Sequence, residues 1–325
     1  MHPAFSVIFL TTLIGAGQGL FLALFTVESY AAFDLLPAQA GRYYATGSAV
    51  ALGFLVAGLI ASFFHLGHPE RAWRSAAKWR SSWLSREVIA LPAFMGTVFL
   101  YGAAHLTGFN PVLATLPSAV PVRLTLLLGV GGTLLAFALF VCTGMIYACL
   151  RFLQEWHTPL TVINFILLGG ASGFVLASAL AAFAAPAAAG FLGGWALILT
   201  ALACAGRAAS LVRNARLKPK STLRTAIGVK HPRIAQKAQG AMGGSFNTRE
   251  FFHGHRPFFL RRAKWVFMTL SFPLPLALIA AGMAAESPLL LMAAFAVQFA
   301  GLLAERWFFF AQANHPQNLY YQAVS

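Results

Sequence analysis

The sequence predicts an all-α, polytopic membrane protein with eight transmembrane helices. Hydrophobic residues make up 59% of its 325 residues and charged residues only 10%, and its mean hydropathy is +0.72. Several stretches almost without charge reach about 20 residues, the length that an α-helix needs to cross roughly 30 Å of hydrocarbon. Backbone groups in lipid must be paired within their own segment, and the alternating pattern of a membrane barrel is absent, so the spans should be helices.

We expect eight spans in one integral membrane domain that covers residues 1–325. Each half of the chain has a short turn after its first helix, a long polar loop after its second, and early prolines in its third. This weak repeat predicts two four-helix bundles related by an axis along the membrane normal, a first bundle over 5–150 and a second over 159–311. The expected spans are residues 5–33, 45–64, 88–106, 124–150, 159–184, 191–212, 265–285 and 289–311.

The basic residues predict the orientation. The loops after the second, fourth and sixth spans carry 19 Lys and Arg residues, whereas the other side carries only Arg42 and Arg123. Loops rich in Lys and Arg stay in the cytoplasm, so both termini should be cytoplasmic, in a bacterial inner membrane. The formal charge of +15 then lies at the inner face, where it suits anionic lipids or an acidic protein. Nucleic-acid binding is disfavoured, because no nucleic-acid-binding fold is present.

The densest polar stretch near the first helices is 65–87, HLGHPERAWRSAAKWRSSWLSRE. A quinone site needs an apolar slot, donors for two carbonyl groups and a group that carries protons. Imidazole titrates near neutral pH, arginine can stabilise an anionic ring, and a carboxylate can relay protons. An alternative is that Ser85 caps the third span and the arginines bind lipid phosphates. The candidate quinone-binding residues are Gln18, His65, His68, Arg71, Trp83, Ser85, Arg86 and Glu87.

Other polar residues in the spans have two interpretations each. Gln18 lies among glycines that allow close helix approach, so it could simply make one inter-helix hydrogen bond. Glu28 is a candidate for proton transfer together with Glu87, because an intramembrane carboxylate suggests function; a pair with Arg42 is the alternative. Arg207 and the pair at 305–306 lie near helix ends, where charged side chains ordinarily reach the membrane surface.

Metal cofactors are not expected on this chain. No C-x-x-C motif accompanies the three cysteines, so no iron–sulfur cluster should bind here, and the histidines lie at helix ends rather than in facing pairs that could hold haem. A transporter is disfavoured, since no polar cluster lies at mid-depth. A purely structural anchor without a quinone site remains the main alternative.

Four segments resemble the membrane-anchor subunits of the dimethyl sulfoxide reductase family. These are HPAFSVIFLTTLIGAGQGLF, HLGHPERAWR with SSWLSRE, SFNTREFFHG and ERWFFFAQANHPQNLYYQ, and the resemblance extends over nearly the whole chain. The NTREFFHG and HPQNLYYQ parts are most similar to anchors of quinone-linked sulfite dehydrogenases. The resemblance implies eight helices that exchange electrons between membrane quinone, either ubiquinone or menaquinone, and two partners: a four-cluster iron–sulfur subunit and a molybdopterin catalytic subunit.

The resemblance also implies roles for particular residues. His65 and Glu87 match the positions tied to quinol binding in the family. In a sulfite-oxidising complex, electrons would pass from sulfite through the clusters to quinone; in a dimethyl sulfoxide- or polysulfide-type reductase the flow would reverse. The basic loop 213–264 would dock the iron–sulfur subunit, since its phenylalanines favour a protein contact, although a lipid-surface segment is the alternative. The expected docking residues are Arg249, Phe251, Phe252 and His315.

Overall fold

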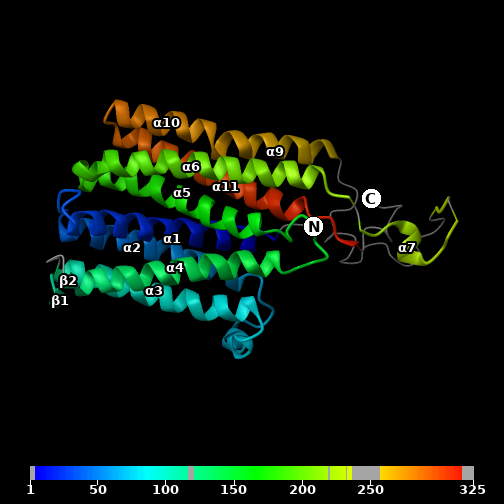
Figure 1. Cartoon of the computed structure of the whole chain (residues 1–325), viewed down its shortest axis with the longest axis horizontal. Helices are drawn as coiled ribbons and strands as arrows, with labels where there is room; N and C mark the ends of the chain where they lie inside the picture. The colour runs from blue at the N-terminus through cyan, green and yellow to red at the C-terminus, as the bar shows by residue number, and fades with distance from the viewer. Residues whose placement is uncertain (1–3, 116–120, 219, 232, 236–256, 317–325) are drawn as a thin grey trace.

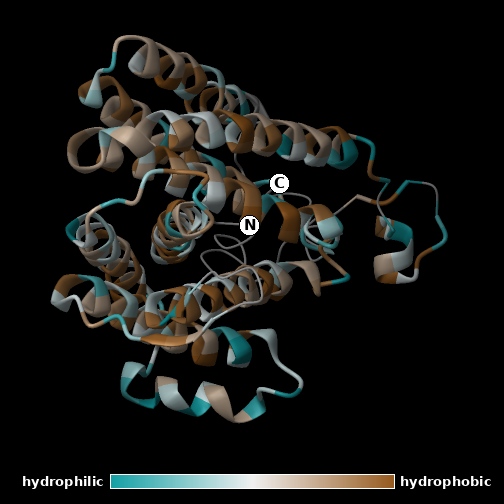
Figure 2. Cartoon of the chain, turned by 60° about the vertical axis from the view of Figure 1, so that its left-hand side comes forward, coloured by the Kyte–Doolittle hydropathy of each residue, from teal (hydrophilic) through white to brown (hydrophobic). Residues whose placement is uncertain are grey.

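The computed structural model describes residues 4–115, 121–218, 220–231, 233–235 and 257–316, with side chains of the last range from Arg262 onward. Long helices run side by side and form an elongated bundle (Figure 1). Brown, apolar residues dominate these helices, and teal residues gather at the connections (Figure 2).

The described elements are almost all helical. Within this part of the chain, eight helices are long and apolar enough to cross a membrane, with Arg262–Ala284 counted as one span over α9 and α10. The prediction of eight spans is therefore confirmed. The long helices are α1 (Phe5–Ala32), α2 (Gly41–Phe63), α3 (Trp83–Thr107), α4 (Leu124–Ala148), α5 (Pro159–Ala184), α6 (Pro186–Ala215), α9 (Pro257–Ser271), α10 (Pro273–Ala284) and α11 (Pro288–Ala311).

Several helices begin earlier than predicted. Helix α6 starts at Pro186 rather than at 191, because proline is suited to the first helical position, where its missing N–H has no partner to lose. Helix α3 starts at Trp83 rather than at 88. Helix α9 starts at Pro257, so part of the predicted loop 213–264 is helical, and Pro273 begins α10 directly after the break at Phe272.

Four short elements were not predicted. A 3₁₀ helix, η1 (Pro69–Lys78), follows α2, and α7 (Leu223–Ile227) follows α6. An antiparallel pair, β1 (Val112–Thr115) and β2 (Pro121–Arg123), precedes α4. We call the end with η1, α7 and residues 149–158 the basic end, and the end with β1 and β2 the opposite end (Figure 1).

Helices α1 and α5 form the centre of the bundle. In each of them 78% of the most apolar window is buried, against 28–39% in the other six spans. Glycines allow their backbones to approach: a Cβ atom at Gly19 would collide with the carbonyl oxygen of Gly169, and one at Gly173 would collide with the backbone of Gly19. This seam joins the first helix of each half of the chain. The predicted grouping into two four-helix bundles stays a prediction.

Candidate functional site

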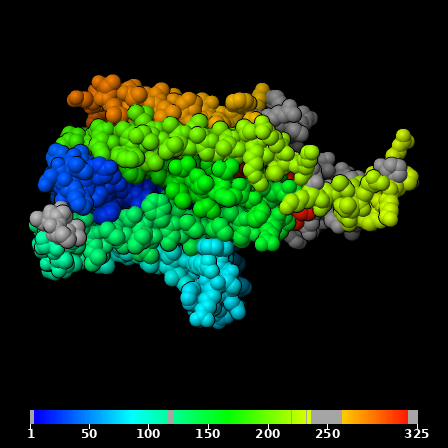
Figure 3. Space-filling model, viewed as in Figure 1, coloured from blue at the N-terminus to red at the C-terminus, as the bar shows by residue number. Residues whose placement is uncertain are grey.

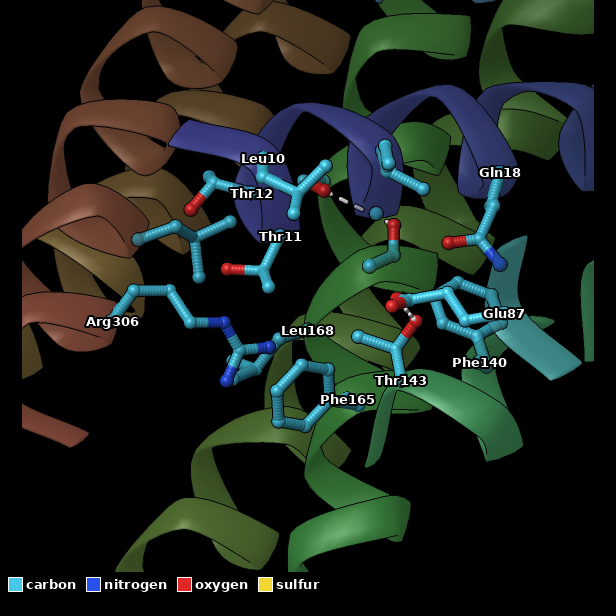
Figure 4. Close-up of a pocket in the computed structure, with 15 residues that line it drawn as sticks. Leu10, Thr11, Thr12, Gln18, Glu87, Phe140, Thr143, Phe165, Leu168 and Arg306 are labelled. Carbon is cyan, nitrogen blue, oxygen red and sulfur yellow. Dashed lines mark hydrogen bonds between the residues drawn. The ribbon is translucent and has the colours of Figure 1, made fainter. Parts of the chain in front are cut away.

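A narrow cavity lies between the central helices, in the half of the bundle near the basic end. Residues of α1, α3, α4, α5 and α11 line it (Figure 4), and we call it the Glu87 cleft. Its polar lining consists of side chains from five different helices. They are Thr11, Thr12, Gln18, Glu87, Thr143, Ser172 and Arg306.

Glu87 reaches the cleft because of how α3 begins. The hydroxyl of Ser82 accepts a hydrogen bond from the backbone N–H of Ser85 at 3.3 Å and so caps the helix. The alternative in which Ser85 is the cap is therefore wrong; its hydroxyl instead donates to the carbonyl oxygen of Ser75 in η1. One turn into the helix, Glu87 Oε1 accepts a hydrogen bond from Thr143 Oγ1 at 2.5 Å, which fixes the carboxyl group against α4.

Gln18 faces the same cleft from α1 and is only 2% exposed. Its Nε2 donates to the carbonyl oxygen of Ala136 at 2.9 Å, so the inter-helix hydrogen bond considered from the sequence is present. The amide oxygen accepts none of the hydrogen bonds found among described residues. Gln18 therefore both joins α1 to α4 and presents an acceptor in the cleft.

Arg306 of α11 contributes a cation that sequence reasoning missed. Its Cζ lies 3.7 Å from the centroid of the Phe165 ring, and its Nη1 lies 3.4 Å from Glu305 Oε2. Glu305 Oε1 in turn lies 2.6 Å from Nε of Arg207 on α6. All three charged residues are at most 5% exposed, so the expectation that they reach the membrane surface is wrong. The sequence did hold a signal for this buried ion pair: Arg207 and Glu305 carry opposite charges on two otherwise apolar helices.

The walls of the cleft are apolar, and its cavity volume is about 20 Å³. That volume holds one or two water molecules. By their chemistry, the donors, acceptors and carboxyl group of the lining suit the two carbonyl oxygens of a quinone. The apolar walls are formed by Leu10, Ile14, Phe140, Phe165, Leu168 and Leu302.

His65, His68 and Arg71 lie elsewhere. The segment between α2 and α3, which contains η1, stands out from the side of the bundle as the cyan projection in Figure 3. All three residues are exposed, and none lines the cleft. His68 Nδ1 and Arg71 Nε lie 3.1 and 3.5 Å from Glu70 Oε1. Of the two residues singled out by the family resemblance, only Glu87 reaches the cleft, and the role of His65 stays a prediction.

Arg86, beside Glu87, points away from the cleft and holds η1 in place. Its Nε donates to the carbonyl oxygen of Trp79 at 2.9 Å, and its Nη2 to that of Arg80 at 2.8 Å. Its guanidinium carbon also lies 4.2 Å from the centroid of the Trp83 ring. Neither Trp83 nor Arg86 lines the cleft. Together with Ser85, they connect η1 to α3.

Glu28, the second predicted proton carrier, lies at the opposite end. Its Oε1 accepts a hydrogen bond from Thr125 Oγ1 at 2.5 Å and lies 3.4 Å from Nε2 of His105. The alternative of an ion pair with Arg42 is not present in the described structure. Glu28 does not line the Glu87 cleft, so its proposed role in proton transfer stays a prediction.

Of the predicted docking residues, Arg249, Phe251 and Phe252 lie outside the described residues. His315 packs its ring 5.4 Å from that of Phe152. It lines a cavity of about 370 Å³ at the basic end, which we call the basic-end cavity. Its polar lining consists of Gln154, Glu155, Asn214, Lys218, Lys220, Ser221, Asn314 and His315.

Comparison with known proteins adds two matches. The family model described as the DMSO reductase anchor subunit (DmsC) matches residues 1–311, which contain every long helix. A protein of Allochromatium vinosum that is named as a subunit of sulfite dehydrogenase is 62% identical over 325 residues, and the match includes 100% of both chains.

Proposed function

Because the chain belongs to the DMSO reductase anchor subunit (DmsC) family, we propose that it anchors a multi-subunit oxidoreductase and passes electrons to a membrane quinone in the Glu87 cleft. The 62% identity to a subunit of a sulfite dehydrogenase supports sulfite as the electron donor of the complex. A molybdopterin subunit would oxidise sulfite to sulfate, and an iron–sulfur subunit would deliver the electrons to this chain. Both partners would lie on the cytoplasmic side, as the charge asymmetry of 19 against two basic residues favours.

The observation that carries the quinone proposal is the meeting of Gln18, Glu87, Thr143 and Arg306 in one buried cleft. A bound quinone would supply the two-electron, two-proton chemistry. Glu87 would donate a proton to a carbonyl oxygen, with its carboxyl held in position by Thr143. The amide of Gln18 would orient the ring, and the guanidinium group of Arg306 would stabilise negative charge as electrons arrive.

The test uses the assembled complex with Glu87→Gln, which keeps the shape of the side chain and removes its proton. We expect sulfite-dependent reduction of a short-chain quinone to fall by about 10²-fold, the scale of general acid catalysis. Reduction of a soluble dye by sulfite should stay unchanged, because that reaction does not need the cleft. Glu286→Gln, at an exposed position near the opposite end, is the matched control.

A second arm separates the two positions that the family resemblance singled out. His65→Ala removes an exposed imidazole outside the cleft, so we expect a smaller loss than with Glu87→Gln. If Glu87→Gln reduces quinone at the normal rate in an assembled complex, the cleft is not the quinone site. If neither variant slows quinone reduction, the chain is a structural anchor.

A further inference from the structure

A line of polar cavities connects the Glu87 cleft with the basic end. Arg306 lines both the cleft and a second, smaller cavity, which we call the Glu305 cavity. Glu155, in the segment between α4 and α5, lines both the Glu305 cavity and the basic-end cavity. Shared lining residues thus place the three cavities next to one another, from the interior of the bundle to its surface.

The charges along this line include two carboxyl groups. Glu305 lies in the middle, in contact with Arg207 and Arg306. Glu155 lies at the basic end, where its side chain accepts a hydrogen bond from the backbone of Asn314. Arginine does not give up its proton in proteins. Between the basic-end cavity, which His315 and two lysines also line, and the Glu87 cleft, the carboxyl groups are therefore the groups that can release and accept protons.

Several buried polar atoms along the line make no hydrogen bond within the described part of the chain. Glu155 Oε2, Asn164 Oδ1, Arg207 Nη2 and Glu305 Oε2 have no hydrogen-bond partner among the described residues. The Glu305 cavity has a volume of about 10 Å³, which is close to the space that one water molecule needs. Leaving such groups unpaired in an apolar interior is costly, so a bridging water is favoured at this place.

Toward the opposite end the buried face of α1 is apolar. On α1, the segment from Gln18 to Glu28 places Leu20, Phe21, Leu24 and Val27 in the core, each with 0% exposure. Ten residues of helix at 1.5 Å per residue separate the two polar side chains by about 15 Å. A polar connection from the Glu87 cleft is thus found toward the basic end and not along α1 toward Glu28.

Glu155 has the properties of a proton-uptake group. Burial raises the pKa of its carboxyl group, and this effect exceeds the opposing influence of Arg213 and of the hydrogen bond from Asn314. The charged and titratable side chains around its cavity are Lys218, Lys220 and His315. A raised pKa keeps the carboxyl group protonated to higher pH, so that it has a proton to pass on.

We propose that Glu155 and Glu305, with water between them, carry protons from the basic end to the Glu87 cleft. The inference rests on the proposed function, in which the cleft binds quinone. Each quinone that becomes quinol takes two electrons from the iron–sulfur partner and two protons through this route. Oxidation of sulfite with one water molecule releases two protons, so uptake on the same side leaves no net proton transfer across the membrane.

The first test is Glu155→Gln in the assembled complex. We expect quinone reduction to slow by about tenfold and its rate ratio between H₂O and D₂O to rise, because proton delivery becomes limiting. In the unmodified complex the rate should fall as the pH rises past the pKa of Glu155, and in Glu155→Gln this part of the profile should disappear. Glu155→Asp should restore part of the rate, while dye reduction and the control Glu286→Gln stay normal.

The outcomes separate the two proposals. If Glu87→Gln slows quinone reduction but Glu155→Gln keeps the normal rate, isotope ratio and pH profile, the route is wrong and the quinone site stands. If Glu87→Gln has no effect either, the quinone site itself fails.

A second measurement tests the side of proton uptake. The complex is reconstituted into vesicles that contain quinone and a trapped pH-sensitive dye, and sulfite is added outside. Only complexes whose basic end faces outward then react. We expect no change of the internal pH during turnover. Alkalinisation inside, approaching one proton per electron, would place proton uptake at the opposite end and overturn the proposal.

Discussion

At the scale of single residues, Glu305 is the buried carboxylate that balances the charges of two buried arginines in the second half of the chain. Its two oxygens lie 2.6 Å from Arg207 Nε and 3.4 Å from Arg306 Nη1. Removing one member of a buried ion pair costs about 3–5 kcal/mol, because the remaining charge stays buried without compensation. Replacing both members with apolar residues of similar size is often close to neutral.

We therefore expect Glu305→Ala to lower the free energy of unfolding of the complex by about 3–5 kcal/mol. The double variant Arg207→Met with Glu305→Met should lose less than Glu305→Ala alone. Thermal unfolding in detergent, followed by tryptophan fluorescence, measures both, with Glu286→Ala as the exposed control. If the double variant is less stable than Glu305→Ala, the ion pair does more than offset the cost of burying its own two charges: it stabilises the fold.

Part of the candidate site could be predicted from the sequence. Gln18 stood out because polar residues in apolar spans are rare, and Glu87 because it ends the polar stretch 65–87 and matches a position in the family resemblance; both line the cleft. Thr143 and Arg306 were missed. Threonine is common in membrane helices, and an arginine near a helix end ordinarily reaches the surface. Their roles come from contacts between residues far apart in the chain, which helical periodicity does not reveal.

At the scale of elements, the seam between α1 and α5 sets how closely the two halves of the chain pack. Lipid chains are as apolar as leucine, so membrane helices associate through close packing of small residues rather than through the hydrophobic effect. At Gly19 and Gly173 the facing backbone leaves no space for a methyl group. An added Cβ atom must push the helices apart, and a flexible side chain cannot absorb the strain.

Gly173→Ala should therefore destabilise the protein by about 1–3 kcal/mol, the usual cost of overpacking. Gly131→Ala, in α4, is the matched control, because a Cβ atom there meets nothing within 4 Å. Alanine in a helix interior is favoured over glycine by about 1 kcal/mol, so this control should be as stable as the unmodified protein or slightly more stable. Equal melting temperatures for the two variants would contradict the packing argument.

The long helices were predictable because length and hydropathy alone define a membrane span. The ends of the helices were harder to predict. Proline can break a helix or begin one, and Pro186 and Pro257 both begin helices. The short elements η1 and β1–β2 lie in connections without hydrophobic periodicity. Their formation depends on neighbours such as Arg86, which binds two carbonyl oxygens at the end of η1.

At the scale of the whole molecule, charge and polar cavities share one end. The described parts of the basic connections, the segment 149–158 with Glu155 and the line of polar cavities from the Glu87 cleft meet at the basic end. If this end faces the cytoplasm, the partner subunits, the source of protons and the anionic lipid surface lie together. The orientation thus determines whether turnover can contribute to a proton gradient.

The orientation can be tested by cysteine labelling in intact cells. In a chain whose cysteines at 142, 149 and 204 are replaced by serine or alanine, Ser81→Cys places a thiol in the exposed connection before α3 and Ala38→Cys places one between α1 and α2. A membrane-impermeant maleimide should label Ala38→Cys directly. It should label Ser81→Cys only after the membrane is made permeable, because the positive-inside asymmetry predicts that this end lies in the cytoplasm. The reverse pattern would place the basic end outside, and with it the route through Glu155, so that quinone reduction would take its protons from the periplasm.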